Sequence, residues 1–357
     1  MAILAITAAQ RLDSRGMPTV QVTMQTECGI FRSIVPSGAS KGDYEAVELR
    51  DGDTHAFHGR GVTKAVHNVE QIIAPAILKS GLDPAFDLKK IDEMMIALDG
   101  TPDKSNLGAN ALLAVSMAAA RAGAAARDKP LYEFIEQESG AAADGFTLPV
   151  PFMNVLNGGE HSGNHMAFQE FMIAPVHAGS FAQAVQWNVE TYMSLRALIV
   201  KRFGTQAVGL GDEGGFAPPV DHPRQALDLL VQAIEDAGHT GKIKIGIDPA
   251  SQSFFTNGKY DLGFKTNHSE LLDSEKLGEL YQQLLEEYPI VLLEDPFGQD
   301  DWTSFAKFHA SSHVELVGDD LLATNRKRIA MAIEKKACNS LLLKVNQIGT
   351  VTEALQA

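Results

Sequence analysis

Four charged residues lie at or near the ends of apolar, strand-like runs in the last third of the chain. They are Asp248, Glu294, Asp319 and Lys344, and 25 residues separate Glu294 from Asp319 and Asp319 from Lys344. That interval is about the length of one strand, one helix and two loops in a barrel of parallel strands. Because residues at the carboxyl ends of such strands face one common opening, three carboxylates and one ammonium group should converge there.

This set of side chains suits a metal-assisted enzyme. Carboxylate oxygens are the hard ligands that Mg²⁺ prefers, and a lysine beside metal ions can have a lowered pKa and act as a general base. Each acid taken alone would equally suit a helix cap or a loop, and a short apolar run is ambiguous between a strand and a buried helix. The repeated spacing favours the metal site over these alternatives.

The elements that must position these residues are those of a two-domain protein, because 357 residues exceed the usual size of one domain. Alternating strand-like and helical segments from about residue 147 predict a parallel α/β barrel. The Gly- and Ala-rich segment 139–145 is the expected boundary, which divides an N-terminal α+β domain (1–142) from the barrel domain (143–357). Within the first domain we expect helices after a meander of three strands, 3–9, 18–26 and 29–36.

Composition excludes several classes of partner and location. A net charge of −15 argues against nucleic acid or an anionic membrane as the main partner. Cys28 and Cys338 lie far apart, which indicates a reducing compartment such as the cytoplasm and no disulfide framework. The apolar start of the chain is too short to span a membrane and is expected to form the first strand instead.

Three glycine-rich segments could carry binding groups. Residues 37–53 read SGASKGDYEAVELRDGD, which is typical either of an ordinary surface loop or of a lid that brings hydroxyl and backbone donors over a site. NGGEHSGN contains His161, and GLGDEGGFAP exposes Asp212 and Glu213 in a turn. A lone histidine in such a loop is usually solvated. The segment SNLGANALLAVSMAAARAGAAARDK is expected to form a long Ala-rich helix that is capped near Ser105 and ends before Pro130.

These segments, with QEFMIAP, KYDL, LLEDPF, GDDLLATN and LLLKVNQIGT, resemble the enolase family, the phosphopyruvate hydratases of glycolysis. The resemblance runs from the first strands to the last residue in the family's order. SGAS, GDEGG and KVNQIGT together distinguish enolases from the wider superfamily of metal-dependent proton abstractors. The resemblance implies an α+β domain followed by an enolase-type TIM barrel. It also implies a lyase that interconverts 2-phosphoglycerate with phosphoenolpyruvate and water, with two Mg²⁺ ions per active site stabilising an enolate.

The resemblance also implies individual roles. Lys344 is the base, Glu213 is the general acid and Glu170 assists it, while His161 faces the substrate and Gln169 lies near the metal. The expected ligands of the first magnesium are Asp248, Glu294 and Asp319. Ser40 would reach the second magnesium from a mobile loop formed by Ser37, Gly38, Ala39, Ser40, Lys41 and Gly42.

Some positions depart from the family pattern. Lys41 stands where threonine is usual, which places a cation beside Ser40. The family implies a homodimer, but Met17 and Gln21 stand where Asn and Glu are usual, and that Glu contributes to subunit contact.

The chain ends at Ala357, before the family's last two barrel units, a Ser-His-Arg-Ser stretch that binds phosphate, and a second lysine. We therefore expect an incomplete copy of an enolase, with little hydratase activity as it stands. The alternative is a truncated homologue that acts as a binding protein. A lyase for another acid sugar or amino acid is disfavoured by SGAS and GDEGG.

Overall fold

The computed structural model describes residues 1–141 and 145–357. The chain divides into two compact units, which are described separately. The first contains Met1–Gly145, Ala323–Ile329 and Leu343–Ala357, and the second contains Phe146–Leu322 and Ala330–Leu342. The predicted boundary between residues 142 and 143 lies outside the described residues. The sequence pattern did not indicate that two later segments group with the N-terminal residues.

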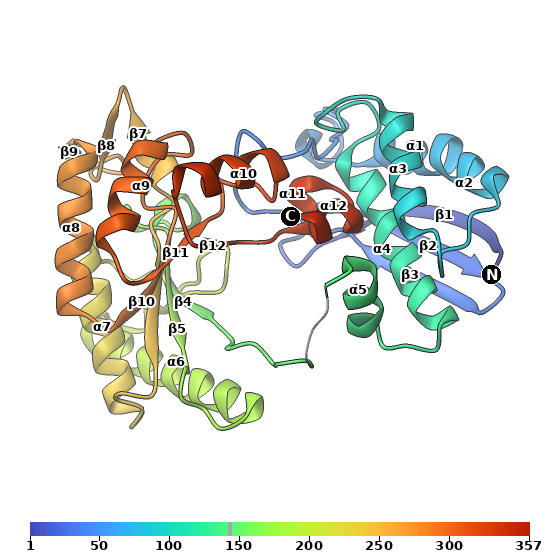
Figure 1. The fold of residues 1–357 in the computed structure, drawn as a ribbon. Helices are drawn as coiled ribbons and strands as arrows, with labels where there is room; N and C mark the ends of the chain where they lie inside the picture. The colour runs from blue at the N-terminus through green and yellow to red at the C-terminus, as the bar shows by residue number, and fades with distance from the viewer. Residues whose placement is uncertain (142–144) are drawn as a thin grey trace. The chain divides into compact units, whose positions relative to one another are not determined.

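The first unit begins with the three-stranded antiparallel meander that the sequence predicts (Figure 1). Its strands are β1 (Ile3–Leu12), β2 (Pro18–Thr26) and β3 (Gly29–Ile34). Along β2, Val20, Val22 and Met24 are fully buried and alternate with more exposed residues, as expected for a strand with one face on the core. Helix α4 (Ala109–Ala126) packs on β2 and β3 and completes this core.

Most of residues 57–139 are helical. The helices are η1 (Phe57–Gly59), α1 (Thr63–Asn68), the π-helical turn η2 (Val69–Ile73), α2 (Ala74–Ser80), α3 (Leu88–Asp99), α4 and α5 (Leu131–Ser139). The expected cap at Ser105 is wrong, because α4 begins after Gly108. The Ser105 amide instead donates to Thr101 Oγ1 at 2.9 Å within a turn. By length and hydropathy α4 could span a membrane, but 78% of it is buried and packing explains its apolar surface.

The last residues of the chain pack on these helices. Helices α11 (Val345–Ile348) and α12 (Val351–Gln356) contact α4, and α12 also contacts α3 and α5. Thr350 caps α12, since its Oγ1 accepts a hydrogen bond from the Glu353 amide at 3.2 Å.

The second unit is built on a six-stranded sheet with the order β12-β11-β10-β6-β5-β4 (Figure 1). The strands are β4 (Met153–Asn157), β5 (Glu170–Ala174), β6 (Lys244–Asp248), β10 (Ile290–Glu294), β11 (Glu315–Gly318) and β12 (Ser340–Leu341). Strand β12 is shorter than the predicted run to Lys344. It is an edge strand that pairs with β11 through two residue pairs, so the rest of the predicted run, up to Lys344, does not form part of the strand.

The prediction of an all-parallel sheet is wrong at β5, which runs antiparallel to both β4 and β6. A parallel pair needs a crossover, usually one helix. Here a loop with the short helix η3 (Gly159–His161) joins β4 to β5, and two helices, α6 (Phe181–Phe203) and α7 (Pro223–Asp236), join β5 to β6. Two successive helices return the chain to the end of the sheet where β5 finished, so β6 must run the opposite way.

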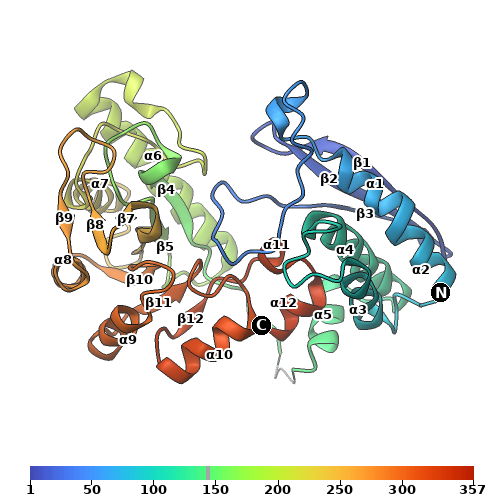
Figure 2. The same cartoon turned by 90° about the horizontal axis from the view of Figure 1, so that it is seen from above.

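Single helices provide the parallel crossovers that follow. They are α8 (Ser274–Glu287), α9 (Trp302–Ser311) and α10 (Arg326–Lys335), while η4 (Thr205–Val208) follows α6. A small antiparallel sheet lies before α8 and contacts it through β8 and β9 (Figure 2). It contains β7 (Phe255–Thr256), β8 (Lys259–Asp261) and β9 (Leu271–Leu272), and η5 (Ser251–Phe254) precedes it.

Candidate metal and proton-transfer site

The six-stranded sheet brings several predicted acids to one edge. Glu170 begins β5 and Asp248 ends β6, and the two are direct register partners. The pairing of Leu293 with Ile247 brings Glu294, the last residue of β10, beside the end of β6. Asp319 directly follows β11, the next strand in the sheet. The carboxyl ends of three parallel strands and the amino end of β5 therefore share this edge.

Asp248 is strongly perturbed by its surroundings. Its pKa is raised well above the usual range, first because its side chain is buried and then because Glu294, Glu170, Asp295 and Asp319 lie near it. One of its oxygens accepts a hydrogen bond from the Ala250 amide at 2.7 Å. Clustered buried carboxylates repel one another unless a cation is bound, and their oxygens are the donors that Mg²⁺ prefers. The donor set at this edge therefore fits a divalent cation.

A compact acidic group at this edge consists of Asp295, Asp319 and Asp320, whose ligand atoms lie within 4.8 Å of one another. Asp295 accepts hydrogen bonds from the amides of Asp319 at 3.1 Å and Asp320 at 2.6 Å. The sequence interpretation missed Asp295 and Asp320, although both follow a predicted ligand directly in LLEDPF and GDDLL. The assignment of Asp248, Glu294 and Asp319 as the ligand set stays a prediction.

A second group, formed by His161, Glu170 and Glu213, also lies within 4.8 Å. His161 Nδ1 is 2.9 Å from Glu213 Oε2, and Asn157 Nδ2 donates to the same oxygen at 3.2 Å. Burial by itself raises the pKa of Glu213, but His161, Glu170 and Asn157 outweigh burial and lower it overall. Two carboxylates and an imidazole this close can hold and exchange a proton. Asn157 at the end of β4 is a further site residue that the sequence interpretation missed.

The glycines of the GDEGG turn explain how Glu213 reaches this position. A Cβ atom at Gly211 would lie 2.6 Å from Asn157 Cβ, and one at Gly215 would lie 2.7 Å from Asn157 Oδ1. Only glycine permits the backbone to approach β4 so closely. The Asp212 amide then donates to the His161 carbonyl at 3.0 Å, which joins the two loops next to Glu213.

His161 is buried, so the alternative of a solvated loop histidine is wrong. Only 3% of its side chain is exposed. Among the described residues, its Nε2 has no hydrogen-bond partner. A buried ring nitrogen without a partner is costly unless a ligand completes it. Gln169 is buried next to this group, and its backbone N–H donates to the Asp248 backbone carbonyl at 3.0 Å.

Two predicted functional residues, Ser40 and Lys344, belong to the first unit. Lys344 is half-buried, and its amide donates to Thr324 Oγ1 at 2.9 Å. The same hydroxyl donates to Gln347 Oε1 at 2.9 Å, so Thr324 fixes the backbone on which Lys344 is carried.

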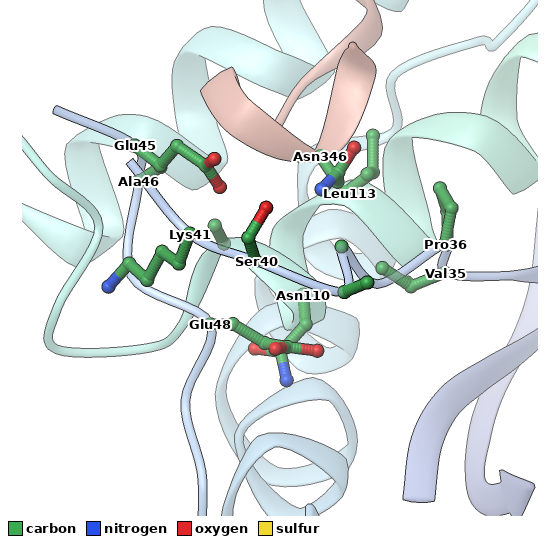
Figure 3. Close-up of a pocket in the computed structure, with 13 residues that line it drawn as sticks. Val35, Pro36, Ser40, Lys41, Glu45, Ala46, Glu48, Asn110, Leu113 and Asn346 are labelled. Atoms are coloured by element: carbon green, nitrogen blue, oxygen red, sulfur yellow. The ribbon is translucent and has the colours of Figure 1, made fainter. Parts of the chain in front are cut away.

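Ser40 and Lys41 line a cavity of about 160 Å³ within the first unit, together with Glu45, Asn110 and Asn346 (Figure 3). Figure 3 shows the Ser40 hydroxyl on the side of Asn346, whereas the Lys41 ammonium extends in another direction. Both side chains are exposed. The cation that departs from the family pattern therefore has room to move independently of Ser40.

The structure thus defines an α+β unit and an α/β unit with hard oxygen ligands and a proton-sharing group at one sheet edge. This combination is typical of metal-dependent lyases. The family model described as enolase, C-terminal TIM barrel domain, matches residues 145–357, and the one described as enolase, N-terminal domain, matches residues 3–135. The chain belongs to the enolase family. The predicted family and fold class are confirmed, and the acidic groups provide candidate sites for the metal that the family uses.

Proposed function

We propose that the protein catalyses the Mg²⁺-dependent dehydration of 2-phospho-D-glycerate to phosphoenolpyruvate. The observation that carries this proposal is the group formed by His161, Glu170 and Glu213, in which a buried imidazole nitrogen lies beside two carboxylates and lacks a partner in the described part of the chain. An enzyme that expels hydroxide from a substrate needs a proton donor of this kind.

The reaction divides into two proton transfers. Lys344 first removes the proton from C2 of the substrate, and the electron pair released is held on the substrate carboxylate as an enolate. That pair then forms the C2–C3 double bond as the C3–O bond breaks. Glu213, assisted by Glu170, passes a proton shared within the His161, Glu170 and Glu213 group to the departing hydroxide, which leaves as water. His161 Nδ1 faces Glu213 Oε2 at 2.9 Å, which leaves Nε2 to donate to the substrate.

Asp248, Glu294 and Asp319 would hold the first Mg²⁺, and Ser40 would contribute to the second. Bound Mg²⁺ supplies electrostatic stabilisation of the negative charge that develops on the substrate carboxylate. We also propose a homodimer in the cytoplasm, which is supported by family membership and by free Cys28 and Cys338.

Two variants test the role assignment. Lys344→Ala should abolish exchange of the C2 proton with solvent deuterium, because it removes the base. Glu213→Gln should retain that exchange while blocking formation of phosphoenolpyruvate, since proton abstraction comes first. Both variants are made in the full-length protein. Equal loss of exchange in both would show that the roles are misassigned, and a full-length wild-type protein that neither exchanges nor dehydrates 2-phosphoglycerate would refute the proposed function.

A further inference from the structure

Lys265 lies in the loop between β8 and β9, and its side chain reaches the loop that carries His161. Its Nζ donates to the Gly159 carbonyl, to the Ser162 carbonyl at 2.9 Å and to Ser162 Oγ at 3.5 Å. The two carbonyls flank His161 in the sequence. One ammonium group therefore holds both sides of the turn in which this buried histidine is carried.

Contacts within the loop that carries Lys265 and with its neighbours define the conformation of that loop. Asp261 Oδ1 accepts hydrogen bonds from the amides of Gly263 at 2.9 Å and Glu270 at 2.7 Å, which closes the loop across its base. A Cβ atom at Gly263 would lie 1.8 Å from the His268 carbonyl oxygen, so this turn needs a glycine. Phe264, next to Lys265, packs on the buried Phe254 with ring centroids 6.0 Å apart.

The contacts continue from the His161 turn to the proton donor. The His161 carbonyl accepts a hydrogen bond from the Asp212 amide at 3.0 Å, and its Nδ1 lies 2.9 Å from Glu213 Oε2. A shift of the turn would therefore change the position of the imidazole relative to Glu213. Hydrogen bonds to a charged donor are stronger than those between neutral groups, so a lysine is well suited to hold two backbone carbonyls in place.

We propose that Lys265 is a positioning residue for the second proton transfer, because it holds the 159–162 turn so that His161 orients Glu213. This inference rests on the proposed function for its catalytic part. Lys265 itself takes no part in either proton transfer. Its removal should therefore affect expulsion of hydroxide and leave abstraction of the C2 proton by Lys344 largely unchanged.

The test compares three variants of the whole protein. Lys265→Met keeps most of the length of the side chain but removes the ammonium group, Lys265→Arg keeps the charge, and Lys259→Met is the control. Lys259 is exposed on β8 of the same hairpin. We expect Lys265→Met to lower kcat for phosphoenolpyruvate formation about 10- to 100-fold, the scale of a small misplacement of catalytic groups. C2 proton exchange should stay within about threefold of wild type, since no contact to the base is removed. Lys265→Arg should recover most of the kcat.

Hydrogen–deuterium exchange of the backbone amides, measured without substrate, gives a second readout that does not depend on activity. Lys265→Met should speed exchange in residues 158–163, whereas Lys259→Met should not. Unchanged amide exchange in Lys265→Met overturns the proposal, as does an equal fall in C2 proton exchange and dehydration. If the wild-type protein does not act on 2-phosphoglycerate, the proposed function fails, and amide exchange still decides whether Lys265 holds the turn.

Discussion

Two buried aspartates, one in each unit, differ in the number of acidic side chains around them. Asp92 on α3 is fully buried and accepts a hydrogen bond from the Thr352 amide at 3.0 Å. A second acid near it, Glu353, is paired with the buried Lys104 at 3.1 Å. Asp248 is equally buried, yet Glu294, Glu170, Asp295 and Asp319 lie around it. Burial raises the pKa of both aspartates, but one further acid lies near Asp92 whereas four lie around Asp248, and the larger cluster of carboxylates favours a bound cation.

The largest expected difference between the two aspartates is in catalysis. Asp248→Asn should reduce formation of phosphoenolpyruvate about a thousandfold, which corresponds to a loss of about 4 kcal/mol of transition-state stabilisation. Asp92→Asn should retain activity within about threefold, because Asp92 has no catalytic role. Steady-state kinetics at saturating Mg²⁺ measures both. Similar losses of activity in Asp248→Asn and Asp92→Asn would show that Asp248 has no special role in catalysis.

The next effect is stabilisation by metal. A ligand that binds only the folded state stabilises it by about 2.7 kcal/mol at a concentration 100 times its Kd. Mg²⁺ should therefore raise the melting temperature of the wild type and of Asp92→Asn, and have little effect on Asp248→Asn. Calorimetry in chelator and in excess Mg²⁺ provides the comparison. If the folded wild-type protein has the same melting temperature with and without Mg²⁺, the predicted metal site is wrong.

Asp92 should make stability depend on pH. Burial, the largest influence, and Glu353 raise its pKa from 3.8 to about 6, against the opposing hydrogen bonds of Thr352 and Ser116. The folded state therefore holds the Asp92 proton more tightly than the unfolded state. This stabilisation is fully present below about pH 4 and is lost as the pH rises through about 6, a change of roughly 3 kcal/mol.

Asp92→Asn should remove this dependence. The free energy of unfolding of the wild type minus that of the variant, measured in chelator at several pH values, should fall between about pH 4 and 6. A difference in the free energy of unfolding that does not change with pH would mean that Asp92 has the same pKa in the folded and the unfolded protein.

The smallest effect concerns Ser116 on α4. Its hydroxyl oxygen accepts a hydrogen bond from the Val351 amide at 2.9 Å at the start of α12. Ser116→Ala leaves that buried amide without its partner and should cost about 1 kcal/mol. Chemical denaturation at neutral pH measures the loss, and Ser105→Ala, in an exposed turn outside α4, serves as the control. A variant as stable as wild type would indicate that the amide finds another acceptor.

The sequence predicted a large part of the structure because the relevant signals are local. The strict alternation in β2 is typical of a strand with one buried face, and a serine and a glycine, Ser180 and Gly204, stand at the two ends of α6 as is typical of helix caps. The order of strand-end acids followed from the length of a strand–helix unit, so Asp248, Glu294 and Asp319 could be assigned to one sheet edge before the sheet was known.

The sequence did not predict the direction of β5, because the local pattern of a strand does not report which way it runs in a sheet. Only the two-helix connection through α6 and α7 reverses it, and that reversal moves Glu170 to the same edge as the carboxyl end of β6. Lys265 was missed for a related reason, since 103 residues separate it from Ser162 and only the packed hairpin brings their atoms to 2.9 Å. Local patterns determined which residues form strands, helices and glycine turns, whereas contacts between distant segments decided which acids, amides and ammonium groups face one another.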